Sequence, residues 1–407
     1  MKAPRWLRSL RRFLEIEALS GIVLAVATVT ALILASSPWA EAYRGFFEWR
    51  WGAVGEHVIT PHWLIDDVLM TIFFFVVGLE IRRELSIGSL SDRKRAALPA
   101  IAALGGMIAP AGLYLLVAGS AITRAGWGIP TATDIAFALG VLSLLGRRVP
   151  TGLRILLLAL AVIDDLGAIV VIAVFYTRGI HVEGLVVAAL ALAIVLIMQR
   201  AHVRSKRAYA IPALLLWGGI FFAGIHPTIA GVVLGLLTPT FASERLILRL
   251  HPYVAYGVMP IFALANAGVR LGSVATDDAS LRVILGITLG LVVGKPLGIL
   301  LASELALRSR IAEAPEGVTT RHLVVLGAIG GVGFTMALFV SGLAFVDASL
   351  LTAARMGVLA ASALAAVIAL VLGRTLLPVV DEDLGRSAQT DPMVSRPPAD
   401  ASGRDRA

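Results

Sequence analysis

The sequence contains no cysteine among its 407 residues, and charged side chains make up only 15% of it. The absence of cysteine excludes disulfides, thiolate metal sites and cysteine nucleophiles. A soluble globular chain carries about 25% charged residues, so this chain has too few to cover its surface in water. Hydrophobic residues make up 58%, and the mean hydropathy is +0.88. The composition therefore predicts an all-α polytopic membrane protein.

Long apolar runs between charge clusters predict the membrane-spanning helices, because about 20 apolar residues are needed to cross the hydrocarbon. We expect about twelve spans. They lie near 13–36, 63–85, 97–118, 123–144, 152–176, 182–199, 207–221, 226–238, 252–269, 281–305, 322–345 and 352–376. The seventh and eighth are short, and merging them would leave eleven.

The distribution of the 35 Lys and Arg residues favours twelve spans with both termini cytoplasmic. With the N-terminus inside, Lys295 lies within a span and seven basic residues lie outside; the others lie inside, as cytoplasmic loops require. An eleven-span arrangement would spoil this alternation after residue 226. The net charge of +8 therefore reflects orientation in the membrane and not nucleic-acid binding. The seven outer residues are Arg44, Arg50, Arg124, Arg178, Arg270, Arg282 and Arg355.

Two segments fall outside the predicted spans of a single membrane domain, residues 1–380. Residues 41–62 alternate apolar and polar side chains, as a strand does. They predict a small extracytoplasmic β-hairpin able to pair across a homodimer, with an aromatic anchor at the membrane surface as the alternative. Residues 381–407 are polar and lack aromatics, so we expect a disordered cytoplasmic tail.

The strongest chemical signal is the pair Asp164-Asp165 in the middle of an apolar span. Each carboxylate at a helix centre costs about 2.5–3.5 kcal/mol on insertion scales. Neighbouring carboxylates compete for one proton, and their oxygens suit hard cations such as Na⁺ or Li⁺. The pair therefore predicts a site that exchanges protons for a transported cation, with an ion pair that locks two helices as the structural alternative.

Two further ionisable residues lie deep in spans. Asp134 follows Pro130 and Thr133, residues that favour a break in the helix, so its carboxylate would lie beside freed N–H groups. A proline-kinked helix with an aspartate N-cap is compatible with this interpretation. Lys295 must find a carboxylate or helix C-terminal carbonyls, unless it snorkels to the surface.

A second interruption is predicted at the glycine-rich stretch 327–335. It has no strand–turn–helix context, so a nucleotide-binding loop is a weak interpretation. Two interrupted spans, one in each half of the chain, point instead to a transporter with its site at the membrane midplane.

The remaining candidates are ambiguous. An unperturbed histidine side chain titrates near neutral pH. His226 is therefore either a pH-sensing residue or a structural histidine at a helix start. Glu80, Arg83 and Glu84 end the second span and form either a cation entrance or a solvated helix end.

These motifs together resemble the NhaA family of bacterial Na⁺/H⁺ antiporters. The matching stretches cover about residues 15–376 in order and spacing. They are 77–85 (VGLEIRREL), 130–141 (PTATDIAFALGV), 162–167 (VIDDLG), 224–226 (GIH), 294–299 (GKPLGI) and 333–336 (GFTM).

The resemblance implies inverted repeats, with the fourth and eleventh spans broken and crossing at the midplane. It implies that Asp165 is the principal cation ligand, that Asp164 carries a proton and pairs with Lys295, and that Thr133 lies beside the cation. Asp134 and Lys295 would offset helix-end charges. By the same resemblance, Glu80, Arg83 and Glu84 belong to a pH-sensing cluster.

The implied activity is electrogenic exchange of two protons for one Na⁺, without a cofactor, by a pH-regulated homodimer. Two departures stand out: Asp66 occupies a position where the family pattern leads us to expect Asn, and Ile247 and Leu248 replace a polar pair. The alternatives are a Na⁺-coupled symporter of similar fold and an intramembrane aspartyl protease. The protease lacks its usual Gly-x-Gly-Asp context here, so we expect no enzyme.

Overall fold

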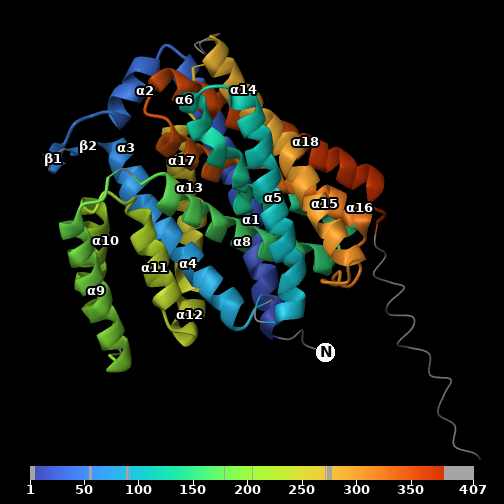
Figure 1. Ribbon diagram of the computed structural model, residues 1–407, viewed down its shortest axis with the longest axis horizontal. Coiled ribbons are helices and arrows are strands. Elements are labelled where there is room, and N and C mark those ends of the chain that lie inside the picture. Colours follow the sequence, from blue (N-terminus) through green and yellow to red (C-terminus); the bar gives the residue numbers. More distant parts are fainter. Residues whose placement is uncertain are drawn as a thin grey trace, which may run out of the picture.

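The computed structural model describes residues 5–379 except 55, 56, 89, 91, 178, 204, 271 and 273–276. Within this part the chain is helical apart from one small antiparallel hairpin (Figure 1). Its strands are β1 (Gly52–Val54) and β2 (His57–Ile59), with Gly52 opposite Ile59 and Ala53 opposite Val58. The predicted tail, 381–407, lies outside the described residues.

The hairpin is confirmed, but the strand-like interpretation of its first half is wrong. Residues Ala40–Phe47 form helix α2. Tyr43 and Phe47 are four residues apart and so lie on one helix face, where their rings meet edge to face at 5.3 Å. Phe47 is buried, so its contact with the core decides the local structure over the alternating pattern.

Seven helical stretches in the described residues are long and apolar enough to cross a membrane. Five are single helices, and two pass through a short π-helical turn. The elements are α1 (Arg5–Ser36), α5 (Arg93–Ala118), α8 (Thr151–Phe175), α9 (Val182–Arg200), α12–η6–α13 (Thr240–Tyr253, Val254–Val258, Met259–Asn266), α14–η7–α15 (Asp278–Leu289, Gly290–Gly294, Lys295–Arg308) and α18 (Ala348–Leu376).

Two more spans are interrupted, as the sequence predicts. The first runs through α6 (Ala121–Arg124), the 3-10 turn η3 (Ala125–Thr131) and α7 (Ile135–Leu144), with a bend of 51°. The second consists of α16 (Thr320–Gly330) and α17 (Phe334–Ala344), bent by 45°. Counting each bent pair as one span makes nine in the described residues.

The other predicted spans are one long helical run with several charged residues and two short helices. They are α3–η1–α4 (Pro61–Trp63, Leu64–Leu69, Met70–Ser86), α10 (Ala210–Phe222) after the turn η5 (Lys206–Tyr209), and α11 (Thr228–Leu237). Gly224 separates α10 from α11 with a φ of +80°, a left-handed conformation that favours glycine. A further short turn, η4 (Gly146–Arg148), precedes α8.

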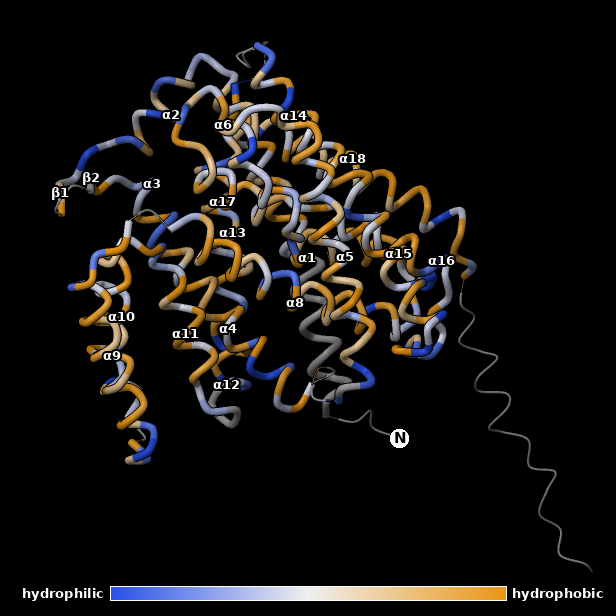
Figure 2. Tube along the Cα trace, in the orientation of Figure 1, coloured by the Kyte–Doolittle hydropathy of each residue, from blue (hydrophilic) through white to orange (hydrophobic). Residues whose placement is uncertain are grey.

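The surface of the helices is apolar, as Figure 2 shows along α9 and α10. Large aliphatic side chains are exposed far from any core, including Ile108 (70%), Leu116 (84%) and Leu214 (69%). In water this much apolar surface would be unfavourable, whereas lipid tails solvate it. The architecture is therefore that of a multi-pass membrane protein.

The helices form two packed groups, which lie left and right in Figure 1. In the α4 group, η1 and α4 pack with α11, α12 and α13, and the pair α9–α10 packs on α11. In the α8 group, α8 packs with α5, η3, α7 and α16. Helices α14 and α15 pack on α5, α17 packs on η3, and α18 packs on α14, α16 and α17. Helix α1 contacts α7 of one group and α13 of the other. We call the end that carries α2, the hairpin and α6 the hairpin side.

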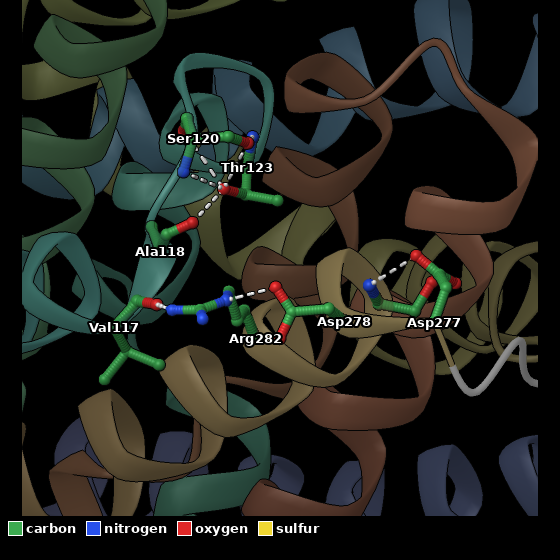
Figure 3. A network of polar contacts seen from close by, with 8 residues as sticks. Val117, Ala118, Ser120, Thr123, Asp277, Asp278 and Arg282 are labelled. Carbon is green, nitrogen blue, oxygen red and sulfur yellow. Dashed lines mark hydrogen bonds and ion pairs between the residues drawn. The ribbon is translucent and has the colours of Figure 1, made fainter.

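Polar contacts on the hairpin side tie elements within the α8 group (Figure 3). The Ser120 and Thr123 side chains form a capping box at the start of α6. Arg282 donates from Nε to Asp278 (2.7 Å) and from Nη1 to the Val117 carbonyl (3.4 Å), which joins α14 to the end of α5. Asp277 caps α14 by accepting from the N–H of Ser280, and this contact lowers the pKa of Asp277.

Helices α5 and α15 cross at two glycines with almost no space between their backbones. A Cβ on Gly298 would lie 2.1 Å from the Gly105 carbonyl oxygen, which is well inside van der Waals contact. This close approach positions Lys295, which lies one turn before Gly298.

We expect Gly298→Ala to force α5 and α15 apart and to lower the free energy of unfolding by about 1–3 kcal/mol, as overpacking does. Thermal unfolding of the detergent-solubilised protein measures this. The control is Gly112→Ala on α5, where nothing lies within 4 Å of the added Cβ; it should be neutral or slightly stabilising. Equal melting temperatures for Gly298→Ala and the parent would contradict the prediction.

Candidate functional site

The two interruptions meet at Asp134, which lies between the bent spans. Its Oδ1 accepts the N–H of Phe137 at 2.9 Å, and its Oδ2 accepts the N–H of Thr335 at 3.1 Å together with the Thr335 hydroxyl. Asp134 thus caps both α7 and α17, whose N-terminal ends carry partial positive charge. Its own N–H donates to the Val332 carbonyl at 2.8 Å, so the two breaks are joined through main chain as well.

Asp164 is held by a buried ion pair. Lys295 Nζ lies 2.8 Å from Asp164 Oδ2, and both side chains are 0% exposed, which rules out snorkelling of Lys295. Lys295 also donates to the Thr131 carbonyl at 2.5 Å, at the end of η3. The cation therefore binds one carboxylate and one helix-end carbonyl, the two kinds of partner that a buried lysine requires.

Thr133 joins the same group from the first interruption. Its Oγ1 lies 2.7 Å from Asp164 Oδ2 and 3.0 Å from the Gly330 carbonyl of the second interruption. A hydroxyl has one proton to donate, so Thr133 donates a hydrogen bond to one of these two oxygens at a time. The interruptions therefore place a donor and several oxygens around Asp164.

Asp165 follows Asp164 on α8 but has different surroundings. It is 1% exposed, and its Oδ1 finds no hydrogen-bond partner among the described residues. It lines a central cavity of about 40 Å³ together with Asp134, Thr335 and Met336. A buried carboxylate without a partner is costly when charged, so this position favours a proton or a bound cation.

Glu80 lines the same central cavity from α4. Its Oε1 lies 3.9 Å from Nε2 of His251, and both side chains are largely buried. Arg83 and Glu84 pair with each other at 3.2 Å, one turn further along α4 and more exposed. The central cavity thus connects Asp165 with titratable groups toward the end of the molecule opposite the hairpin.

His226 does not join Glu80, Arg83 and Glu84. Its Nε2 lies 3.5 Å from Asp67 Oδ1, and both residues line a larger cavity of about 1030 Å³ on the hairpin side. Asp67 precedes Glu80 by 13 residues along η1 and α4, a helical rise of about 20 Å. The candidates therefore divide between the hairpin cavity and the central cavity.

One aromatic layer separates these two cavities. Phe339 on α17 packs against Phe74, Phe262 and His226, with ring centres 5.4, 6.2 and 5.1 Å apart. Along α17, Met336 lines the central cavity and Gly342 lines the hairpin cavity. Phe339 lies midway between them, about 4.5 Å from each by helical rise. The layer closes the path between Asp165 and the hairpin side.

Sequence reasoning singled out neither His251, Thr335 nor Phe339 as a functional residue. Thr335 was visible as part of the glycine-rich interruption, but nothing local indicates that it bonds to Asp134, 201 residues away. His251 and Phe339 carry no pattern beyond an ordinary helix. His251 meets Glu80 within the α4 group, whereas Phe339 contacts Phe74 and Phe262 across the boundary between the two groups.

Comparison with known proteins finds matches along nearly the whole chain. The family model described as Na⁺/H⁺ antiporter 1 matches residues 11–372. The Na(+)/H(+) antiporter NhaA 2 of Myxococcus xanthus is 53% identical over 91% of this chain and 90% of its own length. The NhaA 2 of Sorangium cellulosum is 47% identical, covering 92% of both chains, and the NhaA of Janthinobacterium sp. is 43% identical over 91% and 94%. The chain belongs to the NhaA family of Na⁺/H⁺ antiporters.

Proposed function

We propose that this protein is an electrogenic antiporter that exchanges two protons for one Na⁺ or Li⁺. The observation that carries the proposal is the pair of neighbouring buried carboxylates in unlike surroundings. Asp165 faces a small cavity and has no ion pair or hydrogen bond at its Oδ1 among the described residues, whereas Asp164 is tied through Oδ2 to Lys295 and Thr133. The Oδ1 of Asp164 likewise has no partner there. Oxygens of this kind bind hard cations, and without a cation they need protons.

Exchange follows from competition for the same oxygens. When Na⁺ binds between Asp164 and Asp165, both carboxylates must be charged, so the proton on Asp165 leaves. Asp164 must also turn from Lys295 toward the ion, which frees a second proton from that pair. Because the site cannot hold the cation and both protons together, each transported ion drives the other in the opposite direction.

Thr133, Asp134 and Lys295 support this exchange without a cofactor. The Thr133 hydroxyl is placed to contact the cation beside Asp164. Asp134 offsets the positive ends of α7 and α17, and Lys295 offsets the negative end of η3 at Thr131. Charges at these helix ends keep the interrupted spans stable in hydrocarbon.

We further propose twelve spans with both termini cytoplasmic in the bacterial inner membrane. The three remaining segments, α3–α4, α10 and α11, make twelve with the nine apolar spans. Each set of three that begins at α5 and at α14 has a bent span as its middle member, which supports inverted repeats. In this topology the hairpin side faces outward.

A homodimer through the hairpin is the proposed assembly. The hairpin and the segment before it expose Trp49 (63%), Trp51 (54%) and Val54 (43%), and short exposed strands are suited to pairing with a second copy. Glu80, Arg83 and Glu84, with His251 beside Glu80, are the proposed inner pH-sensing group. His226 would sense pH from the outer cavity.

Asp165→Asn should abolish exchange, because an amide neither releases a proton nor neutralises a cation. Proteoliposomes with an imposed pH gradient and ²²Na⁺ measure the flux. The control is Asp92→Asn. Asp92 is an exposed N-cap of α5, and asparagine caps a helix about as well as aspartate does. Full gradient-driven flux in Asp165→Asn would refute the assignment, and Na⁺ uptake that requires an organic solute would favour the symporter.

Thr133→Val should raise the KM for Na⁺ about tenfold or more and keep measurable turnover. It removes the hydroxyl oxygen that is placed to contact the cation, and an interaction with a charged group is worth about 1.5–3 kcal/mol. Initial rates against Na⁺ concentration test it. The matched control is Thr131→Val, since the Thr131 hydroxyl bonds to the Gly128 carbonyl and not to Asp164. An unchanged KM in Thr133→Val would remove Thr133 from the site.

Exchange of two protons for one Na⁺ moves one net charge across the membrane, so the membrane potential should drive exchange. One charge across 100 mV is worth about 2.3 kcal/mol, enough for a Na⁺ gradient of about 50-fold without a pH difference. Valinomycin and a K⁺ gradient set the potential in proteoliposomes, and the final Na⁺ ratio is measured. A ratio independent of potential would show electroneutral exchange.

A further inference from the structure

Three polar residues form a continuous bridge on the hairpin side. Asn266, at the end of α13, donates from Nδ2 to Asp66 Oδ1 at 2.8 Å and accepts from Arg355 Nη2 at 2.7 Å. Asp66 belongs to η1, and Arg355 to α18. A single amide thus connects a carboxylate and a guanidinium that come from distant parts of the chain.

Most of the bridge is buried, so the loss of one of its hydrogen bonds would be costly. Asn266 is 2% exposed, and the Nε of Arg355 is buried with no hydrogen-bond partner among the residues that the structure describes. Asp66 is a quarter exposed, with His62 Nδ1 3.2 Å from its second oxygen. Hydrogen bonds to charged groups are stronger than neutral ones, and loss of the amide would leave Arg355 in an apolar region.

The bridge crosses the boundary between the two helix groups. Asp66 and Asn266 belong to the α4 group, whereas Arg355 belongs to the α8 group, where α18 packs on α14, α16 and α17. Both cavities lie on this boundary: Asp67 and His226 of the α4 group face Gly342 of the other across the hairpin cavity. The Phe339 layer lies on the same boundary.

We propose that the Asp66–Asn266–Arg355 bridge is a latch that holds the hairpin side closed. The proposal rests on the antiport function, in which Asp165 must reach each side in turn. For a cation to pass from Asp165 to the hairpin cavity, the groups must separate at Phe339, and the bond from Arg355 to Asn266 must break. The bridge therefore sets how often the site opens outward.

Asp66 is the negatively charged member of the bridge, joined to the guanidinium of Arg355 through Asn266. An Asn there would keep a hydrogen bond to Asn266 but would remove the negative charge that balances Arg355. The carboxylate therefore makes the closed arrangement more favourable in this chain than an amide would.

The experiment uses the absence of cysteine in the sequence. A single reporter, Met336→Cys, places a thiol on the central cavity beside Asp165. A membrane-impermeant maleimide is added to right-side-out vesicles and, separately, to inside-out vesicles, and the labelling rate is measured for each. Asn266→Leu removes both bonds with little change in shape, and Asp66→Asn removes only the charge.

We expect Asn266→Leu to speed labelling from the hairpin side about tenfold and Asp66→Asn about threefold, with no increase from the opposite side. The matched control is Asp278→Asn, which removes an ion pair with Arg282 on the same side but within the α8 group (Figure 3). It should change neither rate.

Unchanged labelling from the hairpin side in both variants would overturn the latch, as would an equal increase from both sides, which indicates general loosening. Asp66→Asn keeps the shape of the site, so it tests the proposal if Asn266→Leu fails to fold. Labelling does not require transport; loss of Na⁺/H⁺ exchange in the parent would therefore refute the proposed function separately.

Discussion

The whole site depends on one carboxylate, Asp134, which caps two interrupted helices at once. Without it, the N-terminal ends of α7 and α17 would direct partial positive charge at each other in a region that excludes water. Its bonds to Phe137 and Thr335 allow the two breaks to lie in contact. That contact brings Thr133 and the Gly330 carbonyl to Asp164. The breaks are stable because each freed group has a partner.

The second feature is that two neighbouring acidic side chains have different surroundings. Asp164 and Asp165 share one helix and one backbone, but Lys295 reaches only the first. Asp165 faces the small cavity that leads toward Glu80 and His251. Two identical side chains thereby acquire different partners, which is the physical basis for a site that holds protons and cations alternately.

The third feature is the boundary between the α4 and α8 groups. The central cavity, the Phe339 layer, the hairpin cavity and the Asp66–Asn266–Arg355 bridge all lie along it. Packed interfaces have discrete arrangements and do not deform continuously. A boundary that carries both the ion path and its polar latch is where movement of one group against the other has the greatest effect on access.

The amino-acid sequence by itself determined the class of protein, the apolar helices, both interruptions and most of the candidate site. Charges such as Asp164, Asp165 and Lys295 are costly in hydrocarbon, so their presence in a span is visible without coordinates. The hairpin was predicted too, although α2 replaced part of it because the burial of Phe47 outweighs local alternation.

Only the tertiary structure decided which groups meet. It placed His226 with Asp67 and not with Glu80, and it joined Asp66 to Arg355 through Asn266. Partners more than a hundred residues apart leave no periodic signal, because their distance depends on how the helices pack and not on the residues between them.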